Sequence, residues 1–322
     1  MKKNAVRGRQ KVMSDRDGIL PDVLAAVGHT PLVALRRIVP DNGVDVVLKL
    51  EAVNPGGSIK DRIARSLIAV AESSGRLRPG GVIVEATAGN TGIALAMAAA
   101  VKGYRSMFVV PDKMSADKIS ILKAYGAEVQ VVPDVPRDND NNYQHVAKRL
   151  AQEIPGGCYM GQFEEAANPE AHYLSTGPEI WDGTQGRVDA VVAGAGTGGT
   201  ISGIGRFLKE KKPGILVVGA DPVGSIFTGP VSPFKIEGMG EDYYPATLDV
   251  TVVDRWLAVS DDEAFAMTRR LAQEEGILVG GSSGAIVHVA LRVAKELKPG
   301  SLIVAVAPDT GRNYLSNIFS GV

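Results

Sequence analysis

Lys60 is the residue whose surroundings in this sequence most favour chemistry. It follows the turn Asn54-Pro55-Gly56-Gly57, and Ser58 can cap the helix that begins there. In the first turn of a helix, the positive helix end and local burial both disfavour an ammonium group. An amine that loses its proton readily is what an imine-forming lysine needs. On composition alone, a solvated lysine beside Asp61 and Arg62 is the simpler interpretation, so the other motifs decide its role.

Two glycine-containing turns each connect a predicted strand to a predicted helix, where backbone N–H groups bind anions. The turn in Glu85 to Gly92 suits a carboxylate, and its Asn90 could hydrogen-bond a ring oxygen of a cofactor. Plain helix capping by Thr87 or Asn90 is the alternative. The turn in Gly194 to Thr200 lets a phosphate approach closely and adds two threonine hydroxyls.

The second turn also has the spacing of a dinucleotide fingerprint. Gly194, Gly196 and Gly199 match it, and Asp221 follows near the required distance. That fingerprint normally opens a nucleotide domain, whereas this one lies past the middle of the chain. Two threonines also suit one terminal phosphate better than a pyrophosphate. A NAD-dependent oxidoreductase therefore stays open as a distant alternative, and so does a non-catalytic α/β binding protein.

Two later turns could line the same cleft. Gly280-Gly281-Ser282-Ser283-Gly284 precedes a predicted helix, and Ala307-Pro308-Asp309-Thr310-Gly311 follows the last predicted strand. Taken alone, the first is better explained as a loop and N-cap, and the second is equally consistent with a simple strand-ending turn. A turn lysine, two anion-binding helix starts and a serine-rich turn nevertheless form a coherent set.

Strands and helices alternate along the chain, which predicts an α/β protein with mostly parallel sheets. Apolar periodicity predicts strands over 44–50, 81–85, 106–110, 127–132, 190–193, 215–219 and 302–307, and helices over 60–71, 92–101, 116–125, 200–211, 261–275 and 285–297. The polar segment 133–142 is predicted as a loop at a boundary between two lobes. The irregular segment 225–244 is predicted as a functional loop or lid.

Composition excludes several classes of protein. The 35 basic and 36 acidic residues give a net charge of -1, so we expect no nucleic acid and no membrane as partner. The single Cys158 allows no intrachain disulfide, and the four histidines form no metal-binding pattern. The basic N-terminus lacks an apolar signal region and is predicted to be a flexible tail of a cytoplasmic protein.

Taken together, these motifs resemble the fold-type II pyridoxal-phosphate family of cysteine synthase and cystathionine β-synthase. The resemblance runs from Gly28-His29-Thr30-Pro31-Leu32 to Asn313-Tyr314, nearly the whole chain. It implies an α/β fold of two lobes with pyridoxal 5′-phosphate in the cleft between them. It also implies a homodimer that acts on small amino-acid and thiol substrates.

The resemblance implies a role for each motif. Lys60 would hold the cofactor as a Schiff base and move the Cα proton. Cofactor contacts would come from Asn90, Gly196, Thr197, Gly198, Gly199, Thr200 and Ser282, where Ser282 meets the pyridine nitrogen. Substrate contacts would come from Thr87, Ala88, Gly89, Thr91, Gln162 and Gly238. No metal is expected.

The resemblance also bears on the lobes and the substrates. Residues 1–45 and 151–322 would form a larger cofactor-binding lobe, and 46–150 a smaller mobile lobe. Gly238 to Pro245 is similar to cystathionine β-synthases, which favours β-replacement of serine or O-acetylserine by homocysteine. Ala88, where many members have serine, and Phe163, typical of cysteine synthase, keep sulfide open as the thiol. The sequence ends at Val322, so we expect no tandem regulatory domains.

Overall fold

Six strands form the larger of two sheets. The computed structural model describes residues 18–87 and 89–320. The strands are β1 (Leu32–Ala34), β2 (Asp45–Leu50), β7 (Ala190–Gly194), β8 (Leu216–Pro222), β9 (Arg255–Val259) and β10 (Leu302–Ala307), in the order β1-β2-β10-β7-β8-β9. β1 pairs antiparallel with β2, and every other neighbouring pair in this sheet is parallel.

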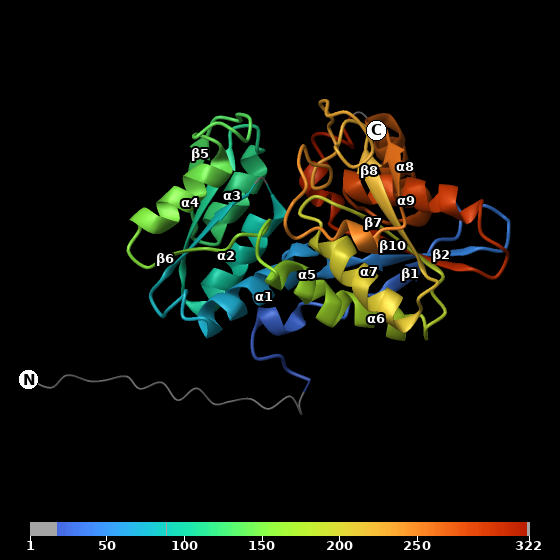
Figure 1. Cartoon of the computed structure of the whole chain (residues 1–322), viewed down its shortest axis with the longest axis horizontal. Helices are drawn as coiled ribbons and strands as arrows, with labels where there is room; N and C mark the ends of the chain where they lie inside the picture. Colours follow the sequence, from blue (N-terminus) through green and yellow to red (C-terminus); the bar gives the residue numbers. More distant parts are fainter. Residues whose placement is uncertain (1–17, 88, 321–322) are drawn as a thin grey trace, which may run out of the picture.

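Four strands form the second sheet, which lies to the left in Figure 1. They are β3 (Val82–Ala86), β4 (Arg105–Pro111), β5 (Glu128–Val132) and β6 (Gly157–Tyr159), in the order β5-β4-β3-β6. All three pairings are parallel. The predicted α/β class with mostly parallel sheets is therefore confirmed.

Helices cover both faces of each sheet. On the six-stranded sheet, α8 (Asp261–Glu275) and α9 (Gly281–Ala294) pack on one face, and α6 (Gly177–Gly183) and α7 (Gly199–Lys211) pack on the other. On the four-stranded sheet, α1 (Lys60–Ser73), α2 (Asn90–Lys102) and α3 (Ala116–Ala124) cover one face, and α4 (Tyr143–Glu153) covers the other. The central strands β3, β7 and β10 are consequently buried almost throughout, as expected for parallel strands covered on both faces.

One helical segment links the two halves. Helix α5 (Ala167–Ala171) continues into a π-helical turn, His172–Thr176, and this segment packs against both α1 and α7. Short 3-10 helices complete the described chain at Val23–Ala26, Glu51–Val53, Val250–Val252 and Gly311–Tyr314. No helix in residues 18–87 and 89–320 is long and apolar enough to cross a bilayer.

Most predicted elements occur within a few residues of their predicted bounds. Helix 261–275 and strand 302–307 have the predicted limits. Helix α9 starts at Gly281, four residues before its predicted start, because the serine-rich turn is itself the buried first turn of the helix. Strands β1, β6 and β9 and helices α4, α5 and α6 were not predicted. The expected N-terminal tail lies outside the described residues.

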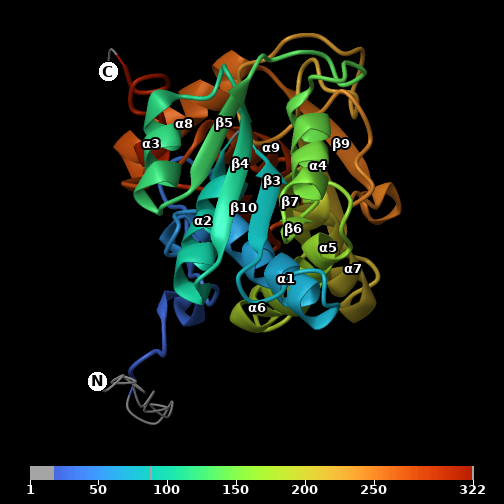
Figure 2. The ribbon, with the colours of Figure 1, turned by 90° about the vertical axis from the view of Figure 1, so that its left-hand side faces the viewer.

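The carboxyl ends of both sheets face one cleft. The segments after β3, β4, β5, β6 and β7 all contribute residues to a single pocket. Figure 2, seen from the side of the four-stranded sheet, shows that sheet in front of the strands of the larger one. Ligands of open α/β sheets bind outside the carboxyl ends of the strands, and here two such edges converge.

Candidate active site

Lys60 lies in the wall of this cleft at the start of α1. The turn before it is held from two sides: Ser58 Oγ accepts a hydrogen bond from the Lys60 backbone N–H at 3.2 Å, and the N–H of Ile59 donates to the carbonyl of Pro308 at 2.8 Å. Burial lowers the pKa of the Lys60 ammonium to about 8, against the opposing effect of the Asp309 and Glu241 carboxylates. A neutral amine is therefore accessible near neutral pH.

A buried ion-pair network anchors the same helix from behind. Arg62 donates to Glu51 at 2.7 and 2.8 Å and to Glu179 at 2.7 Å, and Lys49 donates to Glu179 at 2.6 Å. Burial alone would raise the pKa of Glu179, but the bonds from Arg62 and Lys49 lower it to about 2. Removing one member of such a network would leave a buried charge without a partner, which is strongly destabilising. The network therefore holds α1 in its position.

The loop Gly196–Thr200, which we call the glycine–threonine loop, joins β7 to α7. Gly198 has a positive φ of 82° and serves as the N-cap of α7. A Cβ at Gly196 would come within 2.9 Å of the Gly238 carbonyl oxygen. The loop therefore presents backbone N–H groups and the hydroxyls of Thr197 and Thr200 at the positive end of a helix, which suits a phosphate.

All predicted cofactor residues except Gly199, which faces Asn168, line one small cavity. Its wall includes Lys60, Asn90, Gly196, Thr197, Gly198, Thr200, Gly238 and Ser282. Ser282 lies in the first turn of α9 and is buried. The cavity thus brings together residues from four helix starts that are separated by up to 222 residues of sequence.

Asn90 lies in the same cavity wall and has unused hydrogen-bonding capacity. Its Nδ2 donates to Asp309 Oδ2 at 2.8 Å, and Tyr314 donates to the same oxygen at 2.7 Å. The Oδ1 of Asn90 is buried and has no partner among the described residues. Asp309, which the sequence placed in a possible cleft-lining turn without a role, is the residue that orients this amide.

The turn Thr87–Thr91, which we call the threonine turn, lies across the cleft before α2. Thr87 Oγ1 accepts hydrogen bonds from the N–H groups of Gly89 at 3.1 Å and Gly92 at 3.2 Å. Thr91 donates to Gln162 Oε1 at 2.6 Å, so two of the residues predicted to contact the substrate lie side by side. Ala88, which was predicted to contact the substrate, lies outside the described residues.

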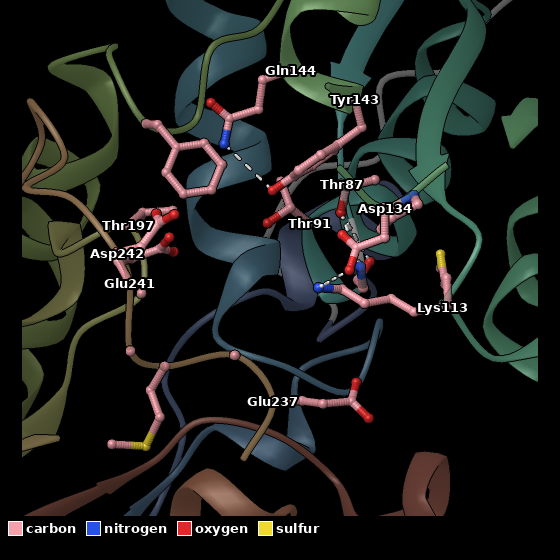
Figure 3. A pocket seen from close by; sticks show the side chains of 18 of the residues that line it. Thr87, Thr91, Lys113, Asp134, Tyr143, Gln144, Thr197, Glu237, Glu241 and Asp242 are labelled. Atoms are coloured by element: carbon pink, nitrogen blue, oxygen red, sulfur yellow. Dashed lines mark hydrogen bonds and ion pairs between the residues drawn. The ribbon is translucent and has the colours of Figure 1, made fainter. Parts of the chain in front are cut away.

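A pocket of about 660 Å³ opens beside Lys60 between the two sheets (Figure 3). Its lining includes the threonine turn, Gln162, the glycine–threonine loop and Gly238. Charged side chains of both signs also line it: Lys113, Lys118, Asp134, Arg137, Glu237, Glu241 and Asp242. Figure 3 shows Glu241 and Asp242 beside Thr197, and Lys113 with Asp134 on the opposite side.

Contacts across this pocket join the two halves of the molecule. Lys118 of α3 forms an ion pair with Glu237, and its ammonium lies 4.8 Å from the centre of the Tyr314 ring. The guanidinium of Arg137 lies 3.4 Å from the centre of the Tyr243 ring. The first pair connects α3 with the irregular segment 225–244, and the second connects segment 133–142 with it. These contacts support the prediction that segment 225–244 is functional.

The position of Asp221 does not support a dinucleotide-binding site. Asp221 is buried and accepts a hydrogen bond from Thr228 at 2.7 Å. It is absent from the walls of both pockets beside Lys60. A ribose-binding carboxylate would have to face a ligand at the carboxyl edge of the sheet.

Comparison with known proteins agrees with this geometry. The family model described as pyridoxal-phosphate dependent enzyme matches residues 23–309. Cystathionine beta-synthase of Oryctolagus cuniculus is 48% identical over 312 residues, 94% of this chain and 57% of that protein. Cysteine synthase of Staphylococcus aureus strain Mu50 is 45% identical over 92% of this chain and 95% of its own length.

A solved structure points the same way. The O-acetylserine dependent cystathionine beta-synthase from Helicobacter pylori superposes with a TM-score of 0.87 at 38% identity, covering 93% of this chain and 98% of that one. The chain spans little more than half the length of the first curated relatives that it matches. The family model covers nearly nine tenths of the sequence, from the first described 3-10 helix to Asp309. This chain belongs to the family of pyridoxal-phosphate dependent enzymes.

Proposed function

We propose that this chain catalyses the pyridoxal-phosphate dependent replacement of the β-substituent of serine or O-acetylserine by homocysteine, which forms cystathionine. The observation that carries the choice of homocysteine is the charged pocket beside Lys60. Its volume of about 660 Å³ exceeds what hydrogen sulfide needs, and its walls carry both signs of charge. An amino-acid thiol has an ammonium and a carboxylate to match them.

The residues of the cavity fit pyridoxal phosphate. Lys60 has a pKa lowered to about 8, so its amine can reach the aldehyde in neutral form. The glycine–threonine loop offers a phosphate site. The amide of Asn90 has a buried Oδ1 without a partner among the described residues and a second Nδ2 proton, so it can hydrogen-bond a ring oxygen of the cofactor. Ser282 is a neutral partner for the pyridine nitrogen. Bound there, the cofactor supplies an electron sink for charge that develops at the substrate Cα.

Lys60 is the proposed base at the Cα. Lys60 lines both the cofactor cavity and the larger pocket, so it lies where the two meet. A general base with a pKa near the working pH is efficient in both directions of proton transfer. Lys60 can therefore remove the Cα proton when the β-substituent leaves and return a proton after the thiol has added.

The threonine turn is the proposed site of the substrate carboxylate. Thr87, Gly89, Thr91 and Gln162 surround the start of α2, and the N–H groups of that helix end favour an anion. Ala88 remains part of this proposal from the sequence resemblance. Gly238, whose carbonyl lies against the glycine–threonine loop, would bound the site from the other side.

The acidic side of the pocket is proposed to receive the ammonium group of homocysteine. Glu241 and Asp242 face the pocket beside Thr197, and Lys113 and Arg137 lie within the same lining. Burial raises the pKa of Glu241 to about 8, with Asp242 adding to the effect. A bound ammonium would stabilise the carboxylate form of Glu241, and this preference is absent for the hydrosulfide anion.

Cysteine synthase is the second candidate. It is supported by the Staphylococcus aureus relative, which this chain matches over nearly its whole length, and by the Gln162-Phe163 pair. In that reaction the acceptor would be sulfide and the product cysteine. The charged walls of the pocket would then have no binding partner on the acceptor.

The deciding experiment measures kcat/KM for four combinations: serine or O-acetylserine as donor, and homocysteine or sulfide as acceptor. We expect homocysteine to be preferred with both donors. Glu241→Gln should lower kcat/KM for homocysteine about tenfold and leave sulfide nearly unchanged. The proposal is wrong if sulfide is preferred, or if the substitution affects both acceptors equally.

Three further proposals complete the assignment. The family resemblance supports a homodimer in the cytoplasm, and light scattering on the purified protein tests the dimer. The two sheets support two lobes, a larger one that carries the cofactor and a smaller mobile one. Strand β2 pairs in the six-stranded sheet and β6 in the four-stranded sheet. We therefore assign residues 45–50 to the larger lobe and 157–159 to the smaller one, which modifies the division at 46 and 150.

A further inference from the structure

Two buried polar side chains lie directly beneath the glycine–threonine loop. Asn168 is in α5 and His172 begins the π-helical turn, so they are one helical turn apart on the same face. Both are fully buried. Each contacts one of the loop threonines, and neither lines the pockets beside Lys60. Buried polar residues of this kind require a reason, because their desolvation costs free energy.

The contacts of Asn168 fix the direction of the Thr197 hydroxyl. The Nδ2 of Asn168 donates to the backbone carbonyl of Gln162 at 2.7 Å, and a carbonyl can only accept. This contact sets the orientation of the amide. The same Nδ2 donates to Thr197 Oγ1 at 2.9 Å. The hydroxyl oxygen of Thr197 is therefore an acceptor below the loop, and its proton is free to point into the cavity.

The contacts of His172 allow the same arrangement at Thr200. Its Nε2 lies 3.2 Å from Thr200 Oγ1 and its Nδ1 lies 2.9 Å from Thr176 Oγ1. Burial holds the pKa of the imidazole well below its usual value, so the ring is neutral with one N–H. With that N–H on Nε2, the ring donates to Thr200 and accepts from Thr176. With it on Nδ1, Thr200 must spend its own proton on the ring.

Helix packing makes these contacts possible. A Cβ at Gly199 would overlap the amide of Asn168, and a Cβ at Gly203 would overlap the carbonyl of Pro169 and crowd His172. These glycines are four residues apart on α7 and face the α5 segment. Their lack of side chains lets the two helices approach until Asn168 and His172 reach the threonines.

We propose that Asn168 and His172 are positioning residues that direct the hydroxyl protons of Thr197 and Thr200 towards the cofactor phosphate. Near neutral pH a phosphate accepts hydrogen bonds and donates few. It therefore favours hydroxyl groups that donate to it, and these are the ones whose oxygens already accept a hydrogen bond from another residue. The inference rests on the proposed function, because that proposal places the phosphate in this loop. It assigns the Nε2–H form to His172 in the holoenzyme.

A double-mutant cycle tests the route through Thr200. The measured quantity is the Kd for pyridoxal phosphate, from its release on dialysis of the holoenzyme. We expect Thr200→Val and His172→Leu each to raise the Kd about tenfold, the scale of one charge-assisted hydrogen bond. The double variant should show no further loss, because both changes remove the same donor.

The outcomes separate the two proposals. A normal Kd for Thr200→Val overturns the phosphate site and this inference together. A raised Kd for Thr200→Val with a normal Kd for His172→Leu overturns the inference alone. Additive losses in the double variant also overturn it, because His172 would then act without Thr200. The cycle of Asn168→Leu with Thr197→Val is judged in the same way.

A rescue variant distinguishes positioning from mere packing. The amide nitrogen of glutamine can take the place of Nε2, so His172→Gln should keep most of the affinity that His172→Leu loses. His145→Gln, on the exposed side of α4, is the matched control and should leave the Kd unchanged. Equal losses for glutamine and leucine at position 172 overturn the inference.

Nitrogen NMR of the unsubstituted holoenzyme tests the tautomer without any change to the site. With ¹⁵N-labelled histidine, the chemical shifts of the two ring nitrogens report which one carries the proton. Assignment uses single substitutions of His29, His145 and His288, the other histidines of the sequence. We expect His172 to be neutral and protonated on Nε2. A proton on Nδ1, or on both nitrogens, overturns the inference.

Discussion

The two turns that we propose to bind anions differ in what lies behind them. The glycine–threonine loop rests on a second layer, since Asn168 and His172 bond its threonines from a helix packed against α7. The threonine turn is held by its own helix start and by residues outside helices: Thr87 accepts from the N–H groups of Gly89 and Gly92, and Thr91 donates to Gln162. Both turns begin a helix, yet only one is fixed by another helix.

The difference matches the ligands proposed for the two turns. A cofactor that stays bound through many turnovers favours a preorganised site, where hydroxyls are oriented before the ligand arrives. A substrate that binds and leaves favours a turn that can close over it. We therefore expect the two turns, despite their similar local sequences, to hold their ligands for different lengths of time.

Lys60 lies between the two turns, and its removal should have the largest effect. Lys60→Ala should lower turnover at least about a thousandfold, because the proposed base at the Cα is lost. Phosphate contacts should still retain some cofactor, which would show that the glycine–threonine loop binds independently of the lysine. Steady-state kinetics and the bound-cofactor content measure the two effects. Near-normal turnover would contradict the mechanism.

Adding one methyl group to each turn tests directly whether the two turns are equally constrained. Gly199→Ala places a Cβ against Asn168, and we expect cofactor affinity to fall about a hundredfold or more. Gly89→Ala is the matched control, because its Cβ would meet only the ammonium of Lys118 at 3.9 Å. It should change the Kd for the cofactor less than about threefold. Similar losses in the two variants would show that the turns are equally constrained.

The pH dependence of the rate of cofactor binding tests whether burial lowers the pKa of Lys60. Burial lowers its pKa from 10.5 to about 8, so the neutral amine becomes about tenfold more abundant between pH 7 and pH 9. The rate at which cofactor-free protein binds pyridoxal phosphate covalently should rise accordingly.

A matched variant sharpens this measurement. Glu241 has a pKa of about 8, so its carboxylate raises the pKa of Lys60 mainly above that pH, and there Glu241→Gln should move the rate profile to lower pH. A profile centred near 10.5, or one that Glu241→Gln does not move, would argue against the buried environment of Lys60. Visible absorbance of the bound cofactor follows the reaction.

The smallest effect is expected in the threonine turn. Thr91→Val removes the hydroxyl that donates to Gln162 at 2.6 Å, and kcat/KM for the amino-acid donor should fall about threefold to tenfold. The Kd for the cofactor should stay the same. Thr197→Val should behave in the opposite way, with weaker cofactor binding as its first effect. If Thr91→Val releases cofactor, the division of labour between the turns is wrong.

The sequence was informative where local chemistry determines structure. Helix α8 has its predicted limits because Ser260 and Glu263 form a capping box and Gly276 ends it with a left-handed C-cap. The Lys60 turn and both anion-binding turns could be located because glycine, proline and hydroxyl residues mark them. The resemblance then linked turns that are far apart in the sequence.

Residues whose role depends on packing could not be found in this way. Asn168 and His172 have no local motif, and their partners Thr197 and Thr200 are 28 or 29 residues away. Asp309 was seen only as part of a turn, because its bonds to Asn90 and Tyr314 form in the folded chain. Strand β9 was missed because all but one of its residues are only half-buried, which weakens the apolar pattern.

Cys158, the only cysteine in the sequence, lies buried in β6. Burial raises the pKa of its thiol, so the thiolate that attacks disulfides is scarce there. In the proposed function the protein would bind homocysteine or sulfide, and both form disulfides or polysulfides when they are oxidised. With its one sulfhydryl shielded in this way, the protein should resist forming mixed disulfides with its own substrates.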